Sequence, residues 1–441
     1  MRKFLLMIVV ALLTACSGSS GDEGAQNQVA ECSNTGQKQF VLDVMRDWYL
    51  WNDLLPADVD IDAFATPEEL LAFLITVQPL DDFSFITTAL QDQQFFGEGK
   101  FEGFGFGSRF VAADDLRLTR VFVDSPANRA GLARGQQILM LDDGINGDRT
   151  IAEIEAAEGL GAIFDISPLA FTMREPDGNV FTVAITQDIV TIDPVPQSRI
   201  IPVAGTPGVG YIEFAQFIST ADPKLDAVFG QFSSMGITDV IIDMRFNGGG
   251  LVSTAELLGD YLGGAVVPNF VFSKTRFNAD RAAANDTQEF FELIANSLGL
   301  SRLIIIASRG TASASELVTN SMEPHVDVTI VGDRTFGKPV GQIGILFCEK
   351  VIRPTAFQTV NANDFGDYFG GLPADCIVAD DLEIAVGADN DPNVEAALTY
   401  VETGSYPVAC VPGVLSKPAV SAFAAKVDRR GPPQREYADA Y

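Results

Sequence analysis

Short apolar runs that alternate with amphipathic segments dominate the second half of the chain. Residues 303–307 are short, apolar and rich in β-branched side chains, and residues 240–245 begin with three such side chains, so both runs are predicted to be buried strands. Weaker runs at 209–214 and 328–331 are predicted to be strands as well. An amphipathic pattern predicts a helix at 224–235. A second helix is expected to follow the segment 246–251 and to end at 262, and Ser313 or Thr311 can cap a third at 314–322. This alternation predicts an α/β domain over residues 191–411.

The first half of the chain has two other patterns. Residues 32–96 are predicted to form a helical domain, because apolar residues recur at helical spacing and Thr66-Pro67 is typical of a capped helix start. Residues 97–190 alternate between strand and turn signals, with a helix expected at 151–161 and a hairpin formed by 169–174 and 180–185. The expected fold class is therefore mixed α/β and multidomain, with a tail at 412–441.

Ser313 and Lys338 are the candidate catalytic residues. Ser313 lies at a predicted strand-to-helix junction, where helix N-terminal amides can stabilise a developing negative charge. Lys338 lies in a Gly-rich turn after a predicted strand, and burial would make it a candidate general base. His325, the only histidine, lies past the end of the serine's own helix, roughly a dozen ångströms away at the helical rise per residue. A serine hydrolase here must therefore use lysine.

The residues around this pair resemble those of the C-terminal processing (tail-specific) serine peptidases. The motif Thr-Ala-Ser-Ala-Ser-Glu at 311–316 and the turn Gly-Asp-Arg-Thr-Phe-Gly-Lys at 332–338 carry the resemblance, with Pro339 where the family usually has glycine. The resemblance implies Ser313 as nucleophile, Lys338 as base and Gln342 as the residue that orients the lysine. Residues 243–250 resemble the segment whose last glycine, with the residue after the serine, forms the oxyanion hole. That implies the N–H groups of Gly250 and Ala314.

The segment Gly103-Phe104-Gly105-Phe106 resembles the carboxylate-binding loop of a bacterial PDZ domain. The resemblance implies that residues 97–190 form a PDZ domain, in which backbone N–H groups bind the C-terminal carboxylate of a peptide. The domain would either capture substrate C-termini or only gate access to the active site. Both possibilities stay open at this point.

The N-terminus carries an export signal. Arg2-Lys3, the apolar residues 4–13 and a small-residue cleavage site predict a signal peptide at 1–15. The site resembles the bacterial lipoprotein box, which implies a lipid on Cys16, a tether at 16–31, and anchoring to a membrane facing the periplasm, the outer membrane if the cell has one. An ordinary secretory signal or a short membrane anchor are the alternatives. The formal net charge of −30 disfavours nucleic acid and anionic headgroups as partners.

Four cysteines remain in the mature chain, and an exported compartment permits disulfides between them. Of the three pairings, we favour Cys348–Cys376, because both lie beside the predicted catalytic sheet, together with Cys32–Cys410, which would tie the start of the mature chain to its end. No Cys-x-x-Cys motif is present and histidine is nearly absent, so neither a zinc site nor a cofactor is expected. The run Asp389-Asn390-Asp391-Pro392 suggests calcium, but Asp391 as a helix cap before Pro392 explains it better.

The expected function is an exported, lipid-anchored serine endopeptidase that forms an acyl-enzyme. Its partners would be protein or peptide substrates with free C-termini, with an adaptor or a second copy also allowed. One alternative is a catalytically silent PDZ scaffold or ligand-binding relative. The other is a hydrolase that uses the same dyad on a non-peptide ester or amide.

Overall fold

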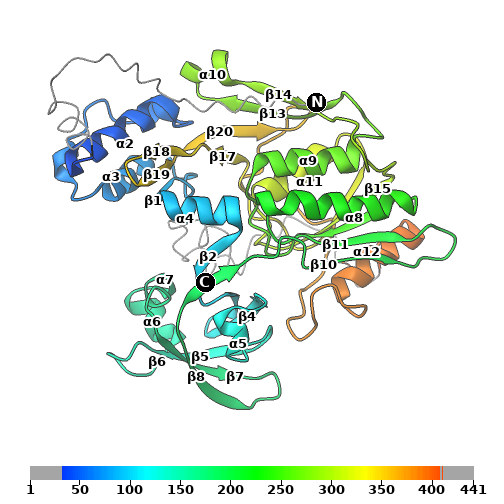
Figure 1. Ribbon diagram of the computed structural model, residues 1–441, viewed down its shortest axis with the longest axis horizontal. Coiled ribbons are helices and arrows are strands. Elements are labelled where there is room, and N and C mark those ends of the chain that lie inside the picture. The colour runs from blue at the N-terminus through cyan, green and yellow to red at the C-terminus, as the bar shows by residue number, and fades with distance from the viewer. Residues whose placement is uncertain (1–31, 408–409, 411–441) are drawn as a thin grey trace, which may run out of the picture.

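The computed structural model describes residues 32–407 and residue 410, which form a helical N-terminal region, a β-rich middle region and an α/β domain (Figure 1). The expectation of a mixed α/β, multidomain chain with an N-terminal helical region is thus confirmed. The predicted signal peptide, the tether with Cys16, and the tail at 412–441 lie outside the described residues. Within the described part of the chain, no helix is long and apolar enough to cross a membrane.

The N-terminal region is built on two capped helices, α2 (Asn34–Trp48) and α3 (Pro67–Leu74). Helix α3 begins as predicted, with the Thr66 side chain accepting a hydrogen bond from the N–H of Glu69 (3.1 Å). The region is not purely helical, however, because β1 (Phe85–Thr88) pairs with β19 (Lys350–Arg353), which also pairs with β18 (Ile345–Phe347). A strand whose partner lies more than 250 residues away carries no local signal that distinguishes it. Helix α4 (Ala89–Gln93) follows β1.

The middle domain extends from β2 (Lys100–Gly103) to β9 (Asp188–Thr191), two strands that pair with each other and join it to the rest of the chain. Its hairpin forms as predicted, as β7 (Leu169–Arg174) and β8 (Val180–Ile185). The helix expected at 151–161 is instead two helices, because Gly159, at φ 80°, interrupts it. The remaining elements are β3 (Phe106–Ala112), β4 (Asp115–Val121), α5 (Pro126–Arg129), β5 (Gln137–Asp142), β6 (Arg149–Thr150), α6 (Ile151–Ala157) and α7 (Leu160–Ile163).

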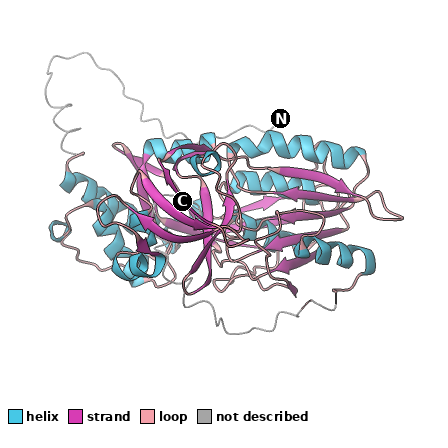
Figure 2. Cartoon of the chain, turned by 90° about the horizontal axis from the view of Figure 1, so that it is seen from below, coloured by secondary structure: helices cyan, strands magenta, loops and turns pink. Residues whose placement is uncertain are grey.

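A six-stranded sheet of order β10-β11-β12-β15-β16-β21 forms the centre of the α/β domain. Its strands are parallel except for the β10–β11 pair, and helices cover both faces (Figure 2). Ile242 and Ile305 pack toward α8, α9 and α11, whereas Ile241 and Ile304 pack toward α12. Burial on both faces explains the continuous apolar runs. The bounds are β10 (Gln197–Ile201), β11 (Val209–Glu213), β12 (Asp239–Asp243), β15 (Arg302–Ala307), β16 (Asp327–Gly332), β21 (Cys376–Ile377), α8 (Asp222–Ser234), α9 (Val252–Gly263), α11 (Ala314–Met322) and α12 (Pro392–Thr403).

A second, antiparallel sheet of order β14-β13-β20-β17 lies between the α/β domain and the N-terminal region (Figure 1). Helix α10 (Ala279–Asn285) connects its first two strands, and Asn278 at the start of that helix donates hydrogen bonds to carbonyl groups of Asp47 and Tyr49. The strands are β13 (Val271–Phe277), β14 (Thr287–Phe290), β17 (Val340–Gln342) and β20 (Thr355–Val360). This sheet brings Gln342 next to the N-terminal region.

The favoured disulfide pairing is wrong. The structure pairs Cys32 with Cys348 and Cys376 with Cys410. Cys348 follows β18, whose sheet packs on the N-terminal helices, so it faces the start of α2. Cys376 lies instead in β21, at the edge of the central sheet near the end of α12. The two residues that seemed to share one catalytic sheet belong to different sheets.

Candidate active site

Ser313 lies at the junction between β15 and α11, immediately before the first helical residue. Its backbone adopts φ 54° and ψ −114°, which is costly for a residue with a side chain. Residues outside the turn hold it in place, because the N–H of Ala312 and the hydroxyl of Ser315 both donate to the carbonyl of Asn247, each at 3.0 Å. Enforced strain at a half-buried serine between a strand and a helix is the geometry of a nucleophile.

The N-terminus of α11 meets the glycine segment that follows β12. Ala314 is the first residue of α11, so its N–H has no acceptor within the helix and is available for a developing oxyanion. A Cβ on Gly249, which has φ 102°, would lie 2.7 Å from both the nitrogen of Ala314 and the Cβ of Ser313. Only glycine allows this approach, and Gly250 is the next residue. The oxyanion roles of Gly250 and Ala314 remain predictions.

Glu316 connects the helix of the serine to the turn that carries the lysine. Its side chain is fully buried, and its carboxylate accepts four hydrogen bonds. Oε2 accepts from the backbone N–H groups of Ser313 (2.9 Å) and Lys338 (2.8 Å). Oε1 accepts from the N–H of Gly337 (2.7 Å) and the hydroxyl of Thr335 (2.5 Å). Because one oxygen binds both nitrogens, the backbones of Ser313 and Lys338 lie within about 6 Å of each other.

Two features of its surroundings shift the pKa of Glu316 in opposite directions. Burial raises the pKa of Glu316, and the four hydrogen bonds offset that rise only in part. Three of the four partners are backbone N–H groups, which can only donate, so the geometry is that of an ionised carboxylate. Glu316 belongs to the motif at 311–316, but no role was predicted for it. Its position three residues after a helix N-cap was the signal that could have found it.

Lys338 is buried in the turn before β17, with 3% of its side chain exposed. Its Nζ donates to Oε1 of Gln342 (3.1 Å), so the structure brings together the two residues that the resemblance implied. The side-chain amide of Gln342 in turn donates to the carbonyl oxygen of Phe83. The ring of Phe83 also contacts the lysine, with Nζ 4.9 Å from the ring centroid. Phe83 belongs to the N-terminal region and was not predicted as a site residue.

His325 lies at the other end of α11 from Ser313, as expected. Its ring packs edge-on against Phe270 and Phe291, and its Nε2 lies 2.9 Å from the carbonyl oxygen of Val271. These contacts show that the histidine packs against apolar side chains near the end of α11. The catalytic roles of Ser313, Lys338 and Gln342 remain predictions, but the structure keeps the histidine away from the serine.

The predicted carboxylate-binding loop lies in the middle domain. The side chains of Phe104 and Phe106 are fully buried in the core of that domain, so they do not form the walls of a peptide groove. The carbonyl of Phe104 accepts from the N–H of Ala127 (2.8 Å), and the carbonyl of Gly105 accepts from the Ser125 hydroxyl (3.1 Å). In a trans peptide the C=O and the next N–H point in opposite directions, so the N–H groups of Gly105 and Phe106 face away from these partners. Peptide binding by Gly103–Phe106 remains a prediction.

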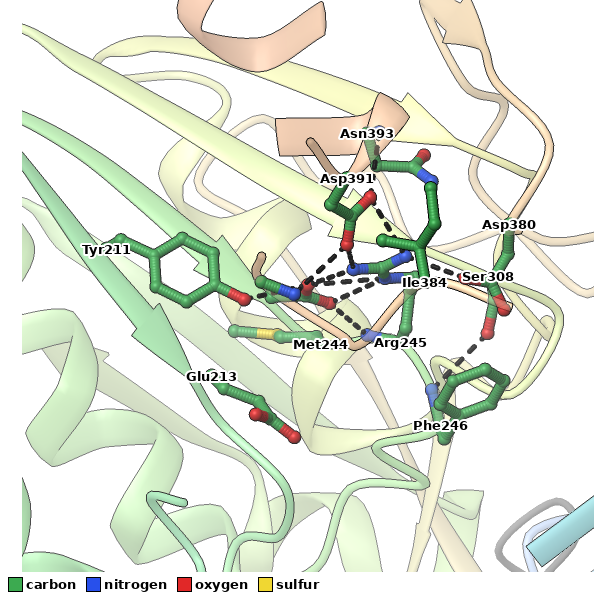
Figure 3. Close-up of polar contacts among 12 residues, drawn as sticks. Tyr211, Glu213, Met244, Arg245, Phe246, Ser308, Asp380, Ile384, Asp391 and Asn393 are labelled. Carbon is green, nitrogen blue, oxygen red and sulfur yellow. Dashed lines mark hydrogen bonds and ion pairs between the residues drawn. The ribbon is translucent and has the colours of Figure 1, made fainter. Parts of the chain in front are cut away.

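A buried arginine cluster is centred on Arg245, which precedes the glycine segment in the chain (Figure 3). Arg245, 1% exposed, binds three carboxylates: Asp243 (2.6 Å), Asp380 (2.7 Å) and Asp391 (2.5 Å). Burial raises the pKa of Asp391, but the charge of Arg245 outweighs it and lowers that pKa overall. Asp391 also caps α12, as predicted, by accepting a hydrogen bond from Asn393. The cluster was not predicted, because Arg245 meets carboxylates that lie 135 and 146 residues away in the chain.

The middle domain is attached to the arginine cluster by its own arginines. Arg134 binds Asp380 (2.6 Å), and Arg120 lies 3.7 Å from the carboxylate of Glu213. Both guanidinium groups lie over the ring of Phe246, at 5.8 Å and 6.0 Å from its centroid. Phe246 has φ 64° and leads directly into the glycine segment. The position of the middle domain is therefore connected to the backbone beside Ser313.

Comparisons with known proteins agree with this arrangement. Residues 208–363 match the family model of peptidase family S41, and residues 36–85 match the peptidase S41 N-terminal domain. The chain belongs to peptidase family S41. S41 peptidases are serine peptidases, and the matched ranges include Ser313, Lys338 and Phe83.

Individual relatives support the same family. The chain is 26% identical to a carboxyl-terminal-processing protease of Picosynechococcus sp. over 293 residues, which is 65% of this chain and 66% of the relative. It is 28% identical to a chloroplastic C-terminal processing peptidase of Tetradesmus obliquus over 240 residues, 48% of this chain and 46% of the relative. The aligned part thus spans between about half and two thirds of these S41 relatives.

Two solved structures show the fold. A putative S41 protease from Bacteroides fragilis superposes with a TM-score of 0.64 at 23% identity, covering 83% of this chain and 97% of that one. The photosystem II D1 C-terminal processing protease superposes with a TM-score of 0.53 at 19% identity, covering 79% of this chain and 93% of that one. At these identities the likeness concerns the S41 fold alone.

Proposed function

We propose that the protein is an exported serine endopeptidase of the C-terminal processing type with a Ser313–Lys338 dyad. The proposal rests on the contacts of Glu316. One oxygen of its carboxylate accepts hydrogen bonds from the backbone N–H groups of both Ser313 and Lys338. The S41 family match and the strained backbone of Ser313 support it. No histidine is placed to serve as the base in the described part of the chain.

The chemistry follows from the position of each group. Lys338, oriented by Gln342, accepts the Ser313 proton while the serine oxygen attacks a peptide carbonyl. The N–H groups of Ala314 and Gly250 stabilise the oxyanion. Lys338 then gives its proton to the leaving amine, and water, deprotonated by the same lysine, hydrolyses the acyl-enzyme.

The remaining parts of the proposal concern where and on what the enzyme acts. A lipid on Cys16 would anchor it to a membrane facing the periplasm. The middle domain would act as a PDZ domain that captures free C-termini, with the backbone N–H groups of Gly105 and Phe106 meeting the carboxylate. The relatives' printed names, which describe C-terminal processing, support a protein substrate of this kind.

The test uses Ser313→Ala, Lys338→Ala and His325→Ala with a panel of peptides and a fluorophosphonate probe. The first two variants are expected to lose peptide cleavage while their melting temperatures stay close to that of the wild type, and His325→Ala is expected to stay active. Ser313→Ala must also lose covalent labelling. An active Lys338→Ala together with an inactive His325→Ala would refute the dyad. Labelling without any peptide turnover would instead favour an esterase or a silent relative.

A further inference from the structure

We propose that the segment Asp81–Ser84, called here the N-terminal loop, positions the catalytic base. This inference rests on the proposed Ser313–Lys338 chemistry and assigns the loop a role in it. Phe83 would hold the pair Lys338–Gln342, and Asp81 would hold Phe83. Neither residue touches the reacting atoms, so both are positioning residues.

The first step is the contact between Phe83 and Gln342. A glutamine side chain has an oxygen and an NH₂ group of similar shape, and its neighbours decide which way it points. The carbonyl oxygen of Phe83 can only accept, so it faces the NH₂ group of Gln342. The amide oxygen must then face the Nζ of Lys338, at 3.1 Å. If the loop moved and took the carbonyl of Phe83 with it, the amide could rotate and the lysine amine would lose its contact with Oε1 of Gln342.

The ring of Phe83 also restricts the position of the Lys338 side chain. Its centroid lies 4.9 Å from Nζ of Lys338. The ring is itself 5% exposed and packs against the ring of Phe336, with centroids 6.1 Å apart. Phe336 precedes the lysine by two residues, so Phe83 contacts both the turn and the amine it carries. A flexible four-carbon stem is thereby confined to one orientation.

Asp81 fixes the loop that presents Phe83. Its side chain is 3% exposed, and its Oδ1 accepts from the N–H groups of Phe83 and Ser84, each at 3.0 Å. Oδ1 also accepts from the hydroxyl of Thr355 (2.9 Å), and Oδ2 accepts from the hydroxyl of Ser84 (2.6 Å). The N–H of Thr355 donates to the Ser84 hydroxyl (2.9 Å). The loop is therefore bound to β20 by side chains that are all buried.

The register of the antiparallel sheet joins these two sets of contacts. Thr355 on β20 lies directly opposite Gln342 on β17. Asp81 binds one member of this cross-strand pair and Phe83 binds the other. A loop that only attached the N-terminal region to the sheet would not need to contact the residue that orients the lysine. The juxtaposition indicates that docking of the N-terminal region completes the base.

The experiment compares Asp81→Ala, Asp81→Asn and Phe83→Leu with Leu70→Ala as matched control. Leu70 is fully buried in the helical core of the same region and makes no part of the loop. We measure kcat and KM on a short peptide, the rate of fluorophosphonate labelling, and Tm. Asp81→Ala, which releases the loop, and Phe83→Leu, which removes the ring from Nζ of Lys338, are expected to lower kcat and the labelling rate about ten- to a hundredfold, less than the roughly 10²–10⁴-fold of a complete general base, with KM changed less than about threefold.

Asp81→Asn is expected to recover most of kcat, because its amide oxygen can still accept from the two backbone N–H groups and its NH₂ group can donate to the Ser84 hydroxyl. Leu70→Ala is expected to lower Tm at least as much as Asp81→Ala while kcat, measured well below Tm, stays at the wild-type value. If Leu70→Ala lowers kcat as much as Asp81→Ala, or if Asp81→Ala and Phe83→Leu keep wild-type kcat, the loop has a structural role only and the inference is wrong.

Lys338→Ala, assayed in the same series, distinguishes the two ways to fail. An inactive Lys338→Ala beside a fully active Asp81→Ala overturns the positioning role and leaves the dyad standing. A fully active Lys338→Ala overturns both, since there is then no base to position.

Discussion

Replacing Glu316 tests the connection between nucleophile and base most directly. In Glu316→Gln one carboxylate oxygen becomes an NH₂ group. If the NH₂ group replaced Oε2, it would face two backbone donors, those of Ser313 and Lys338. If it replaces Oε1, it faces only the N–H of Gly337, because the hydroxyl of Thr335 can rotate and accept. The second orientation is the cheaper one, and it preserves the contact that holds Ser313 and Lys338 together.

The magnitudes follow from the number of donors left without an acceptor. A buried donor without a partner costs about 1–3 kcal/mol, so Glu316→Gln should lower the free energy of unfolding by about that amount. Glu316→Ala leaves three backbone N–H groups, those of Ser313, Gly337 and Lys338, without their acceptor. The cost is roughly 3–9 kcal/mol, and water that enters the cavity reduces it. A domain is typically stable by about 5–15 kcal/mol, so the alanine variant approaches the limit of folding.

The pH dependence gives an independent check. Because burial raises the pKa of Glu316 in the folded state, the folded protein binds the proton more tightly than the unfolded chain does. The contribution of Glu316 to stability is therefore largest below the ordinary glutamate pKa and falls as pH rises through the raised value. Glutamine does not titrate, so the stability advantage of the wild type over Glu316→Gln should shrink as pH rises through this range.

Urea denaturation at several pH values, with peptide cleavage measured in parallel, checks these expectations. Glu316→Gln should fold, lose about 1–3 kcal/mol and keep activity within about tenfold of the wild type. Glu316→Ala should lose cleavage and most of its stability. A stable and active Glu316→Ala would refute the anchoring role. A fully stable Glu316→Gln that is as inactive as Ser313→Ala would show that the carboxylate takes part in the reaction itself.

Three further predictions concern other parts of the chain. Asp391→Asn should lower the free energy of unfolding by about 3–5 kcal/mol at neutral pH, and since Arg245 lowers the pKa of Asp391, the deficit relative to the wild type should shrink on acidification below about pH 4. Amidating a substrate's C-terminus should weaken its binding about ten- to a hundredfold if Gly105 and Phe106 bind the carboxylate, whereas equal cleavage rates would leave gating as the role of the middle domain. Cys16→Ala should release the protein from membranes in fractionation, and a variant still extracted only by detergent would contradict the lipid anchor.

The parts of the site that could be predicted are the local ones. Ser313, Ala314 and Lys338 lie in one stretch, and the apolar runs and turn residues around them place the first two at the start of a helix and Lys338 in the turn between two strands. Helix α11 was predicted at 314–322 and the structure has it there, because the helix is short, follows a buried strand and begins at a serine. The strands β12 and β15 were equally clear, since burial on both faces leaves only apolar residues between their ends.

The parts that could not be predicted all depend on contacts between distant residues. Gln342 is oriented by Phe83, and Arg245 is neutralised in part by Asp380, across separations of 259 and 135 residues. A sequence pattern reports the periodicity of one segment, but it does not report which polar residue of another segment will meet it. The disulfide prediction was wrong for the same reason. Cys348 was given a partner from its position in the chain, whereas its partner in the structure depends on the sheet beside which it lies. Local patterns thus locate the reacting groups, while their orientation depends on how the N-terminal and middle regions dock.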